Sequence, residues 1–244
     1  MSEKQAWPVA ELDETGSTND EAKRRAVAGE AGPLWIRAER QTLGRGRRGN
    51  EWQSLRGNLF ASLLCRPEKS ASRCAQLSFV TALAVTDMLA HYAPSANIRL
   101  KWPNDVLADG RKIAGILLES ESRTGGGLNW LVIGVGVNLK AYPLGTEIPA
   151  ISLADLGIAP PPAAEAMGHL VTAFAKWYEV WRKDGFAPLR EAWLARSTGL
   201  GSRIRVRLPK EEIQGVFRDI DDNGALVLGL PGATRIIAAG EVFL

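Results

Sequence analysis

Between residues 98 and 139 the chain alternates apolar and polar residues in segments broken by two glycine-containing turns. The alternation runs from Ile98 to Trp102 and stops at Pro103, and a residue before proline is disfavoured in helix. The turn signals are Asp109-Gly110 and Gly125-Gly126-Gly127, both typical of hairpins. The pattern predicts a strand that ends in a turn over residues 101–105, then strands over 112–121 and 129–139. Any fold of this chain therefore contains a sheet built from sequence neighbours.

Helical spacing occurs in three other places. Thr18 and Glu21 have the Thr-x-x-Glu form of a capping box, which predicts a helix from Thr18 to about Gly29. Apolar residues recur at helical spacing over 72–93 and again from Leu170 to Trp181, and a further helix is expected through Leu194. Strands are expected over 7–14, 34–40 and 58–66. Strands and helices thus both contribute to this part of the chain.

From Gly199 onward the chain consists of short alternating segments with frequent turn signals. Asp222-Asn223-Gly224 and Pro231-Gly232 are the clearest of these turns. Short strands joined in this way are typical of a small β-barrel or sandwich. The expected strands cover 204–208, 213–219, 225–230 and 234–238. We therefore place a domain boundary near residue 197, which divides the chain into residues 1–197 and 198–244.

Composition excludes several classes of protein. Hydrophobic residues make up 45% and charged residues 23% of the 244 residues, as in ordinary globular proteins and unlike disordered chains. No apolar run approaches the ~18 residues of a membrane span. The start of the chain, with Glu3 and Lys4, lacks the apolar stretch of a secretory signal. We expect a cytoplasmic protein with no membrane partner.

Few residues are available for metal or histidine chemistry. The chain has two histidines and two cysteines, Cys65 and Cys74, which we expect to be free thiols. A zinc site or a histidine-centred triad would lack parts, so we expect no protein metal site. The chemistry must depend on Lys, Arg, Asp, Glu and backbone groups. The net charge of +3 permits a nucleic-acid partner, but the densest basic cluster lies among glycines, which favours phosphate on a small molecule.

That cluster is Gly44-Arg45-Gly46-Arg47-Arg48-Gly49. It fits the pattern G-x-G-x-x-G, but a dinucleotide-binding turn requires a following helix, and a strand is expected here instead. Guanidinium groups offer paired donors to phosphate or carboxylate oxygens. We therefore expect the loop to close on an anion; the alternative is a solvated basic loop between two strands.

Two further strings carry residues suited to chemistry. Lys101-Trp102-Pro103-Asn104-Asp105 places a lysine at a strand end, where its charge can stabilise negative charge on a phosphoryl or carboxylate oxygen. Asn104 and Asp105 either cap the turn or act directly. In Gly134-Val135-Gly136-Val137-Asn138 the glycines allow a ligand to approach closely, and Asn138 can hydrogen-bond a base edge. Taken alone, this last string also fits a β-bulge.

In their order and spacing these strings closely resemble the biotin protein ligases. The resemblance covers about residues 10–140 and extends through the C-terminal segment, and it is specific because several independent strings agree. It implies an α+β fold in which helices flank a mixed β-sheet, as in class II aminoacyl-tRNA synthetases and lipoate ligases, followed by a small SH3-like β-barrel. The strings are Ser17-Thr18-Asn19, Gln41, the Gly/Arg loop through Trp52, Lys101 to Asp105, Lys112 to Leu117 and Gly134 to Asn138.

The resemblance also implies a two-step ligase reaction. The carboxylate of biotin attacks the α-phosphate of ATP, which carries Mg²⁺, to give biotinyl-5′-adenylate. A lysine of a biotin carboxyl carrier protein, from acetyl-CoA carboxylase or a related carboxylase, then takes the acyl group. Such chemistry needs anion stabilisation and alignment more than a histidine base. The alternatives are a lipoate ligase or octanoyltransferase on the same scaffold and, outside enzymes, a basic nucleic-acid-binding regulator.

By matching positions, the resemblance assigns roles to single residues. Lys101, Arg45 and Arg47 are the expected catalytic residues: Lys101 binds the carboxylate and α-phosphate oxygens, and the arginines close over the acyl phosphate. Trp52 stacks on adenine and Asn138 holds its edge. The expected binding residues are Ser17, Thr18, Asn19, Gln41, Gly44, Arg45, Gly46, Arg47, Trp52, Lys101, Gly115 and Asn138.

Two loop positions depart from the family pattern: Asn50 replaces a commonly basic residue, and Leu55 replaces a common proline. The lost charge predicts weaker retention of the adenylate. Some family members carry an N-terminal DNA-binding unit, but only sixteen residues precede Ser17, too few for three helices, so we expect no operator binding. A homodimer is common in the family and is compatible with this sequence.

Overall fold

A computed structural model describes residues 7–244, and its largest element is a seven-stranded sheet. The strand order is β1-β2-β3-β7-β6-β5-β4. β1 is parallel to β2 and every other neighbouring pair is antiparallel, so the expected mixed sheet is confirmed. The strands are β1 (Val9–Thr15), β2 (Leu34–Gln41), β3 (Leu59–Cys65), β4 (Ile98–Lys101), β5 (Asp105–Ala108), β6 (Arg111–Ser122) and β7 (Leu128–Val137).

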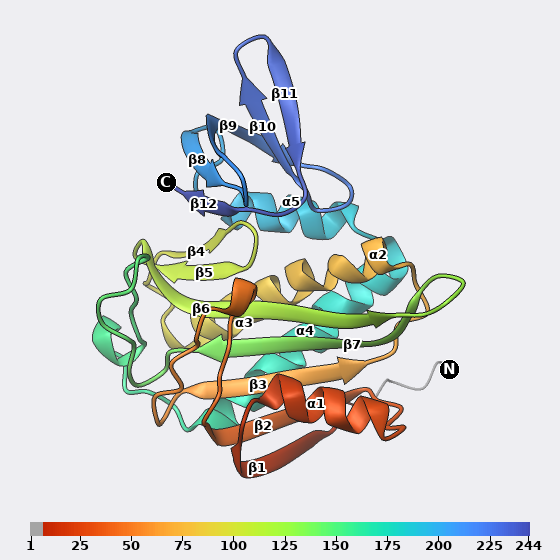
Figure 1. Ribbon diagram of the computed structural model, residues 1–244. Helices are drawn as coiled ribbons and strands as arrows, with labels where there is room; N and C mark the ends of the chain where they lie inside the picture. The colour runs from red at the N-terminus through yellow and green to blue at the C-terminus, as the bar shows by residue number, and fades with distance from the viewer. Residues whose placement is uncertain (1–6) are drawn as a thin grey trace.

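Helices cover both faces of this sheet (Figure 1). α1 (Thr18–Val27) packs on one face against β3 and β7, and α3 (Leu77–Tyr92) and α4 (Ala163–Asp184) pack on the other. β3 is consequently buried at all of its positions, as expected for a strand covered on both sides. Within that apolar strand Ser62 is the one polar residue, and it faces α1.

The helix expected over residues 72–93 is divided in the structure. α2 (Ala71–Ala75) precedes α3, and Gln76 lies between them. The buried Gln76 amide accepts a hydrogen bond from Trp181 Nε1 (2.8 Å) and donates one to the Asp222 carbonyl (2.9 Å). Gln76 thereby joins the helical layer to the C-terminal segment.

One helical segment among residues 7–244, Ala71–Tyr92, is long and apolar enough by length and composition to span a membrane. Within its most apolar window, 72% of the residues are buried inside the protein. A helix that packs against both a sheet and α4 needs apolar residues on most of its surface. Its composition is therefore that of a core helix.

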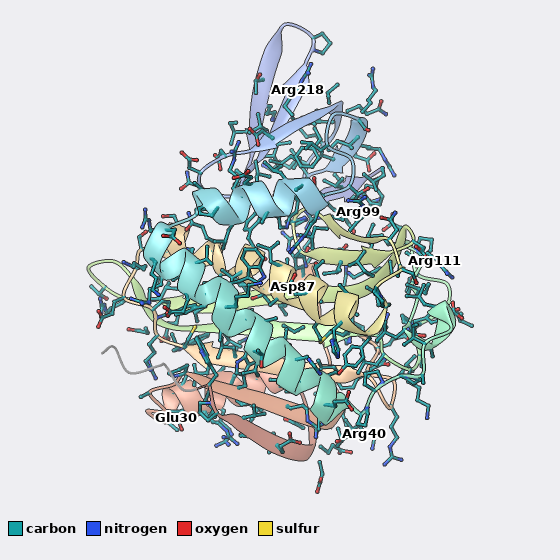
Figure 2. All side chains as sticks on the ribbon, turned by 180° about the vertical axis from the view of Figure 1, so that it is seen from behind. Glu30, Arg40, Asp87, Arg99, Arg111 and Arg218 are labelled. Carbon is teal, nitrogen blue, oxygen red and sulfur yellow. The ribbon has the colours of Figure 1, made fainter. Side chains whose placement is uncertain are left out.

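The second predicted helical stripe forms α4, which crosses the back of the sheet (Figure 2) and is followed by α5 (Ala187–Arg196). Leu170, Phe174 and Trp181 are buried as predicted. Asp87 of α3, labelled in Figure 2, accepts a hydrogen bond from Trp177 Nε1 (2.8 Å) and pairs with Arg196 Nη1 (3.1 Å). One carboxylate thus connects three helices.

The C-terminal segment forms a separate five-stranded antiparallel sheet, so the small all-β unit is confirmed. The strand order is β11-β10-β9-β8-β12, and the ladder between the described end strands is not closed into a full barrel. The fifth strand was not predicted from the sequence. The strands are β8 (Arg203–Arg207), β9 (Glu212–Ile220), β10 (Leu226–Leu230), β11 (Ala233–Ile237) and β12 (Glu241–Phe243).

The start of α1 differs from the predicted capping box. Ser17 is the N-cap residue, and Thr18 is already helical. The Thr18 hydroxyl donates to Gln41 on β2 (3.1 Å) instead of capping the helix, and Glu21 pairs with Arg24 and Arg25. The prediction was wrong because tertiary hydrogen bonds to β2 outcompete the local cap. The consequence is that Thr18 faces the interior between α1 and β2.

Replacing Glu21 by glutamine is expected to lower the free energy of unfolding by about 1 kcal/mol at pH 7, since the ion pairs are partly solvated. Hydrogen bonds from Arg24 and, to a smaller extent, from Arg25 together lower the pKa of Glu21 from 4.5 to about 2. A carboxylate with a depressed pKa stabilises the fold above its unfolded pKa and loses this contribution as the pH falls through the folded value. Urea unfolding at pH 7 and at decreasing pH measures the difference, with Glu30→Gln as the control; equal stability at pH 7 would contradict the prediction.

Candidate active site

A cavity of about 340 Å³ lies where α1 begins, between the Gly/Arg loop, the centre of the large sheet and the C-terminal strand. Every predicted site residue except Gly44 lines it. Gly44 instead lies at the base of the loop, where a Cβ would stand 2.5 Å from Ser54 Oγ and from the Trp52 carbonyl oxygen. Gly44 therefore contributes to the shape of the loop and not to the wall of the cavity.

Three glycines form the floor of the cavity. Gly115 on β6 is paired with Gly136 on β7, and Gly134 lies two residues earlier on β7. A Cβ on Gly136 would collide with the Trp52 indole, and a Cβ on Gly134 would collide with the Asn19 amide. The β6–β7 register is regular here, so the bulge considered for residues 134–138 is wrong. The glycines allow side chains of α1 and of the loop to lie directly on the sheet.

One end of the cavity is a buried hydrogen-bonded wall. The Thr18 backbone N–H and hydroxyl both donate to Gln41 Oε1 (2.8 and 3.1 Å). Ser62 Oγ lies 2.7 Å from Thr18 Oγ1 and 2.6 Å from Asn19 Oδ1. Ser17, Thr18 and Asn19 are each less than 5% exposed. Polar groups fixed in this way present donors and acceptors of defined direction to a ligand.

The opposite end holds a nearly buried cluster of two lysines and one aspartate. Asp105 Oδ2 lies 3.3 Å from Lys101 Nζ, and Asp105 Oδ1 lies 2.6 Å from Lys112 Nζ. Burial lowers the pKa of Lys101, and the attraction of Asp105 opposes that shift only in part. Within this cluster one carboxylate faces two ammonium groups, so the cluster itself has one more cation than anion.

The Gly/Arg loop is a short hairpin over this end. The Gly46 N–H donates to the Asn50 carbonyl (2.7 Å), and the Trp52 N–H donates to the Gly44 carbonyl (3.0 Å). Within the loop, η1 (Arg47–Gly49) carries Arg48 at a φ of 56°. The loop thus has a defined backbone conformation, and its arginine side chains point in different directions.

The two predicted catalytic arginines of the loop have different partners. Arg45 pairs with Asp20 at 2.5 Å and with Glu119 at 3.2 Å. Arg47 Nη1 donates to Asn104 Oδ1 and to the Gly240 carbonyl, both at 3.2 Å, and no carboxylate of residues 7–244 lies within ion-pair distance of it. Burial lowers the pKa of Arg47, and the neighbouring Arg48 adds to that shift. Of the three loop arginines, Arg47 is therefore the one without a carboxylate partner among residues 7–244 and is the best placed to bind the anionic group of a ligand.

Two buried polar atoms in this cavity have no hydrogen-bond partner among the described residues: Asn138 Oδ1 and Trp52 Nε1. The Asn138 amide donates to the Ile151 carbonyl (3.1 Å), which fixes its orientation. Buried polar groups in folded proteins are rarely left unpaired, so each such atom indicates a missing partner. The orientation of Asn138 makes its oxygen available to a donor on a ligand.

Several residues in the cavity or directly behind its wall have roles that the sequence did not settle. Ser62 could have been found, because a serine is unusual in a strand as apolar as β3. Asn104 donates to the Ile116 carbonyl (2.7 Å), which confirms a turn-fixing role for it, and Asp105 holds the two lysines. Gly240, Glu241 and Val242 line the cavity, and Glu119 lies behind it in contact with the lining residues Asn19 and Arg45. Glu119 and the three C-terminal residues gave no sequence signal, because only the tertiary fold brings them to the site.

The fold and the cavity together define a small-molecule site with a hydrogen-bonded wall at one end and cationic groups at the other. The chain belongs to the biotin/lipoate A/B protein ligase family, whose model matches residues 13–138. The model of the biotin protein ligase C terminal domain matches residues 199–244. The family assignment therefore covers both sheets.

Within this family the chain is similar to proteins named for one particular activity. It is 44% identical to the biotin--[acetyl-CoA-carboxylase] ligase of Paracoccus denitrificans, over 95% of this chain and 98% of the relative. It is 37% identical to the protein of the same name from Mycobacterium tuberculosis, over 94% and 86%. The biotin protein ligase of Aquifex aeolicus, solved in complex with biotin and ATP, shares the fold with a TM-score of 0.82 at 24% identity, over 97% of each chain.

Proposed function

We propose that this protein is an ATP-dependent ligase that converts biotin to biotinyl-5′-adenylate and transfers the biotinyl group to a lysine of a biotin carboxyl carrier protein. The observation that carries the proposal is the pairing, in one cavity, of a buried polar wall with cationic groups, of which Arg47 has no carboxylate of residues 7–244 within ion-pair distance. The names of the two curated relatives support biotin over lipoate or octanoate.

In the proposed first step, a carboxylate oxygen of biotin forms a bond to the α-phosphorus of ATP, and the bond from that phosphorus to the bridging oxygen of the β-phosphate breaks. Pyrophosphate leaves with the electron pair. The polar wall formed by Ser17, Thr18, Asn19 and Gln41 would hold the neutral head of biotin and so fix the direction of its carboxylate. Lys101 and Arg47 would stabilise the charge on the reacting oxygens.

The nucleotide would occupy the side of the cavity near Trp52 and Asn138. The Trp52 indole offers a flat surface for adenine. The unpaired Asn138 Oδ1 is an acceptor suited to the exocyclic amine of adenine. Residues 7–244 contain no cluster of three or more His, Cys, Asp or Glu side chains arranged for a metal ion, so Mg²⁺ would arrive on the phosphates of ATP.

In the proposed second step, the amine of the acceptor lysine attacks the carbonyl carbon of the adenylate. An amide bond forms, the bond to the phosphate oxygen breaks, AMP leaves, and the amine loses a proton to solvent. The acceptor would be the carrier protein of acetyl-CoA carboxylase or a related carboxylase. Cys65 and Cys74 are free and buried, which suits a reducing compartment, and we propose that the reaction takes place in the cytoplasm.

The test is exchange of labelled pyrophosphate into ATP, measured separately with biotin, lipoate and octanoate. We expect exchange with biotin only, and AMP release together with biotin on the acceptor lysine when a carrier domain is added. Exchange with lipoate or octanoate in place of biotin would assign the chain to the alternative activity. Absence of exchange with all three acids, in a folded sample, would refute the proposal.

A further inference from the structure

We propose that Glu119 is a positioning residue that connects the polar wall of the cavity to the Gly/Arg loop: it orients the Asn19 amide in the wall and, with Asp20, holds Arg45 of the loop until a phosphate competes for it. This inference rests on the proposed function for the identity of the ligands. Glu119 lies on β6, outside every string that the sequence analysis singled out.

The Glu119 carboxylate has a partner on each side. Oε2 accepts a hydrogen bond from Asn19 Nδ2 (2.7 Å) and lies 3.2 Å from Arg45 Nη2. Oε1 lies 2.5 Å from Lys23 Nζ. Burial alone would raise the pKa of Glu119, but the hydrogen bonds from Lys23, Asn19 and Arg45 outweigh it and hold the pKa below its usual value. The group is therefore ionised at neutral pH and acts only as an acceptor.

An ionised acceptor at this position fixes the Asn19 amide. Because Glu119 takes the NH₂ group of Asn19, the Asn19 carbonyl oxygen must point to Ser62, whose Oγ lies 2.6 Å from it. The reverse orientation would place the amide oxygen against a carboxylate and is disfavoured by repulsion. Asn19 also lies directly over Gly134 on the floor. The carboxylate thus sets the hydrogen-bonding pattern that a ligand meets at the polar wall.

The same carboxylate restrains the loop. Arg45 forms two hydrogen bonds to Asp20, at 2.5 and 2.6 Å, and its contact with Glu119 adds a second acid. Arg45 therefore differs from Arg47, which has no carboxylate partner in the described chain and displaces no acid when it meets an anion. A phosphate can recruit Arg45 only by displacing these two acids. Since Glu119 also holds Asn19, loop closure is coupled to the polar wall.

The experiment compares wild type, Glu119→Gln, Asp20→Asn and the control Glu121→Gln. Glu121 is an exposed acid two residues further along β6, outside the network. Calorimetry measures biotin binding without ATP, and hydrogen exchange follows the bonded amides of Gly46, Asn50 and Trp52. Glu119→Gln should weaken biotin binding about tenfold, through a lost charge-assisted hydrogen bond. Both Glu119→Gln and Asp20→Asn should accelerate exchange in the loop by roughly two- to fivefold, the range of a partly exposed ion pair.

Asp20→Asn should leave biotin binding within about twofold of wild type, because the Asp20 carboxylate accepts hydrogen bonds from Arg45 and, among residues 7–244, makes none with Asn19. A merely structural role of Glu119 would lower the melting temperature without moving biotin affinity or loop exchange, and this outcome would overturn the proposal. If Glu119→Gln does not fold, Glu119→Asp takes its place, because it keeps the charge on a shorter side chain. Smaller changes in biotin affinity and in the hydrogen exchange of the loop are then required. If wild type does not bind biotin, the proposed function fails, while loop exchange still decides whether Glu119 and Asp20 restrain Arg45.

Discussion

Lys101→Ala is expected to reduce adenylate formation by about a thousandfold while leaving the fold intact, because loss of one preorganised electrostatic contact at a developing charge has this order of effect. Lys101 is 4% exposed and lies at the end of β4, so its ammonium group is held in a fixed position at the cavity. The substitution leaves no isolated buried charge, since Asp105 keeps Lys112 at 2.6 Å. Activity and folding should therefore separate.

Biotin-dependent pyrophosphate exchange measures the activity of Lys101→Ala, and circular dichroism measures its fold. Lys183→Ala on the exposed side of α4 is the matched control. Exchange at the wild-type level would refute the role of Lys101.

The lowered pKa of Lys101 also predicts how this residue affects the free energy of unfolding. Because burial lowers it, the charged lysine destabilises the folded state at every pH below the folded pKa, and this cost disappears only as the pH rises past the ordinary value of 10.5. The neutral variant Lys101→Met should therefore be at least as stable as wild type at pH 7. An inactive protein of undiminished stability would show that the lysine is present for chemistry and not for folding.

Arg47→Gly is expected to release the adenylate roughly 10- to 100-fold faster, which corresponds to the loss of a hydrogen bond to a charged group. Arg47 connects the loop to Asn104 and to the Gly240 carbonyl, so it closes the cavity from the side opposite the polar wall. Faster release should appear as biotin on lysines of bystander proteins, since a free adenylate reacts without guidance.

The measurement is biotin incorporation into serum albumin added to the reaction, together with the decay of bound adenylate in a single turnover. Arg111→Gly, an exposed arginine of β6 that pairs with Asp155, is the matched control (Figure 2). Bystander labelling equal to that of wild type would show that Arg47 does not retain the intermediate.

Much of the large sheet and the cation end of the cavity could be predicted because their signals are local. Gly/Arg alternation, the strand-end Lys101 and the glycine-rich end of β7 each lie within a few residues of sequence. The Cys65 and Cys74 thiols are free, as expected from the short supply of cysteines. These features follow from turn chemistry, charge and side-chain period, which a single segment contains.

The features that escaped prediction depend on partners far along the chain. β12 is three residues long, and it is a strand because it pairs with β8. Helix α2 ends at Ala75, before Gln76, whose side-chain amide bonds to Trp181 of α4 and to the Asp222 carbonyl. Thr18 hydrogen-bonds to Gln41 instead of forming the predicted cap, and Glu119 contacts Arg45, which lies 74 residues away in the sequence. In each case tertiary contacts decide a local conformation that the segment alone leaves open.

The contribution of Gly240, Glu241 and Val242 to the cavity wall has a practical consequence for handling the protein. Leu244 is 63% exposed and follows this wall almost immediately. A purification tag fused behind Leu244 would begin beside the cavity wall and, under the proposed function, could obstruct the approach of the acceptor. Preparations that differ only in tag placement are therefore not interchangeable in assays of transfer.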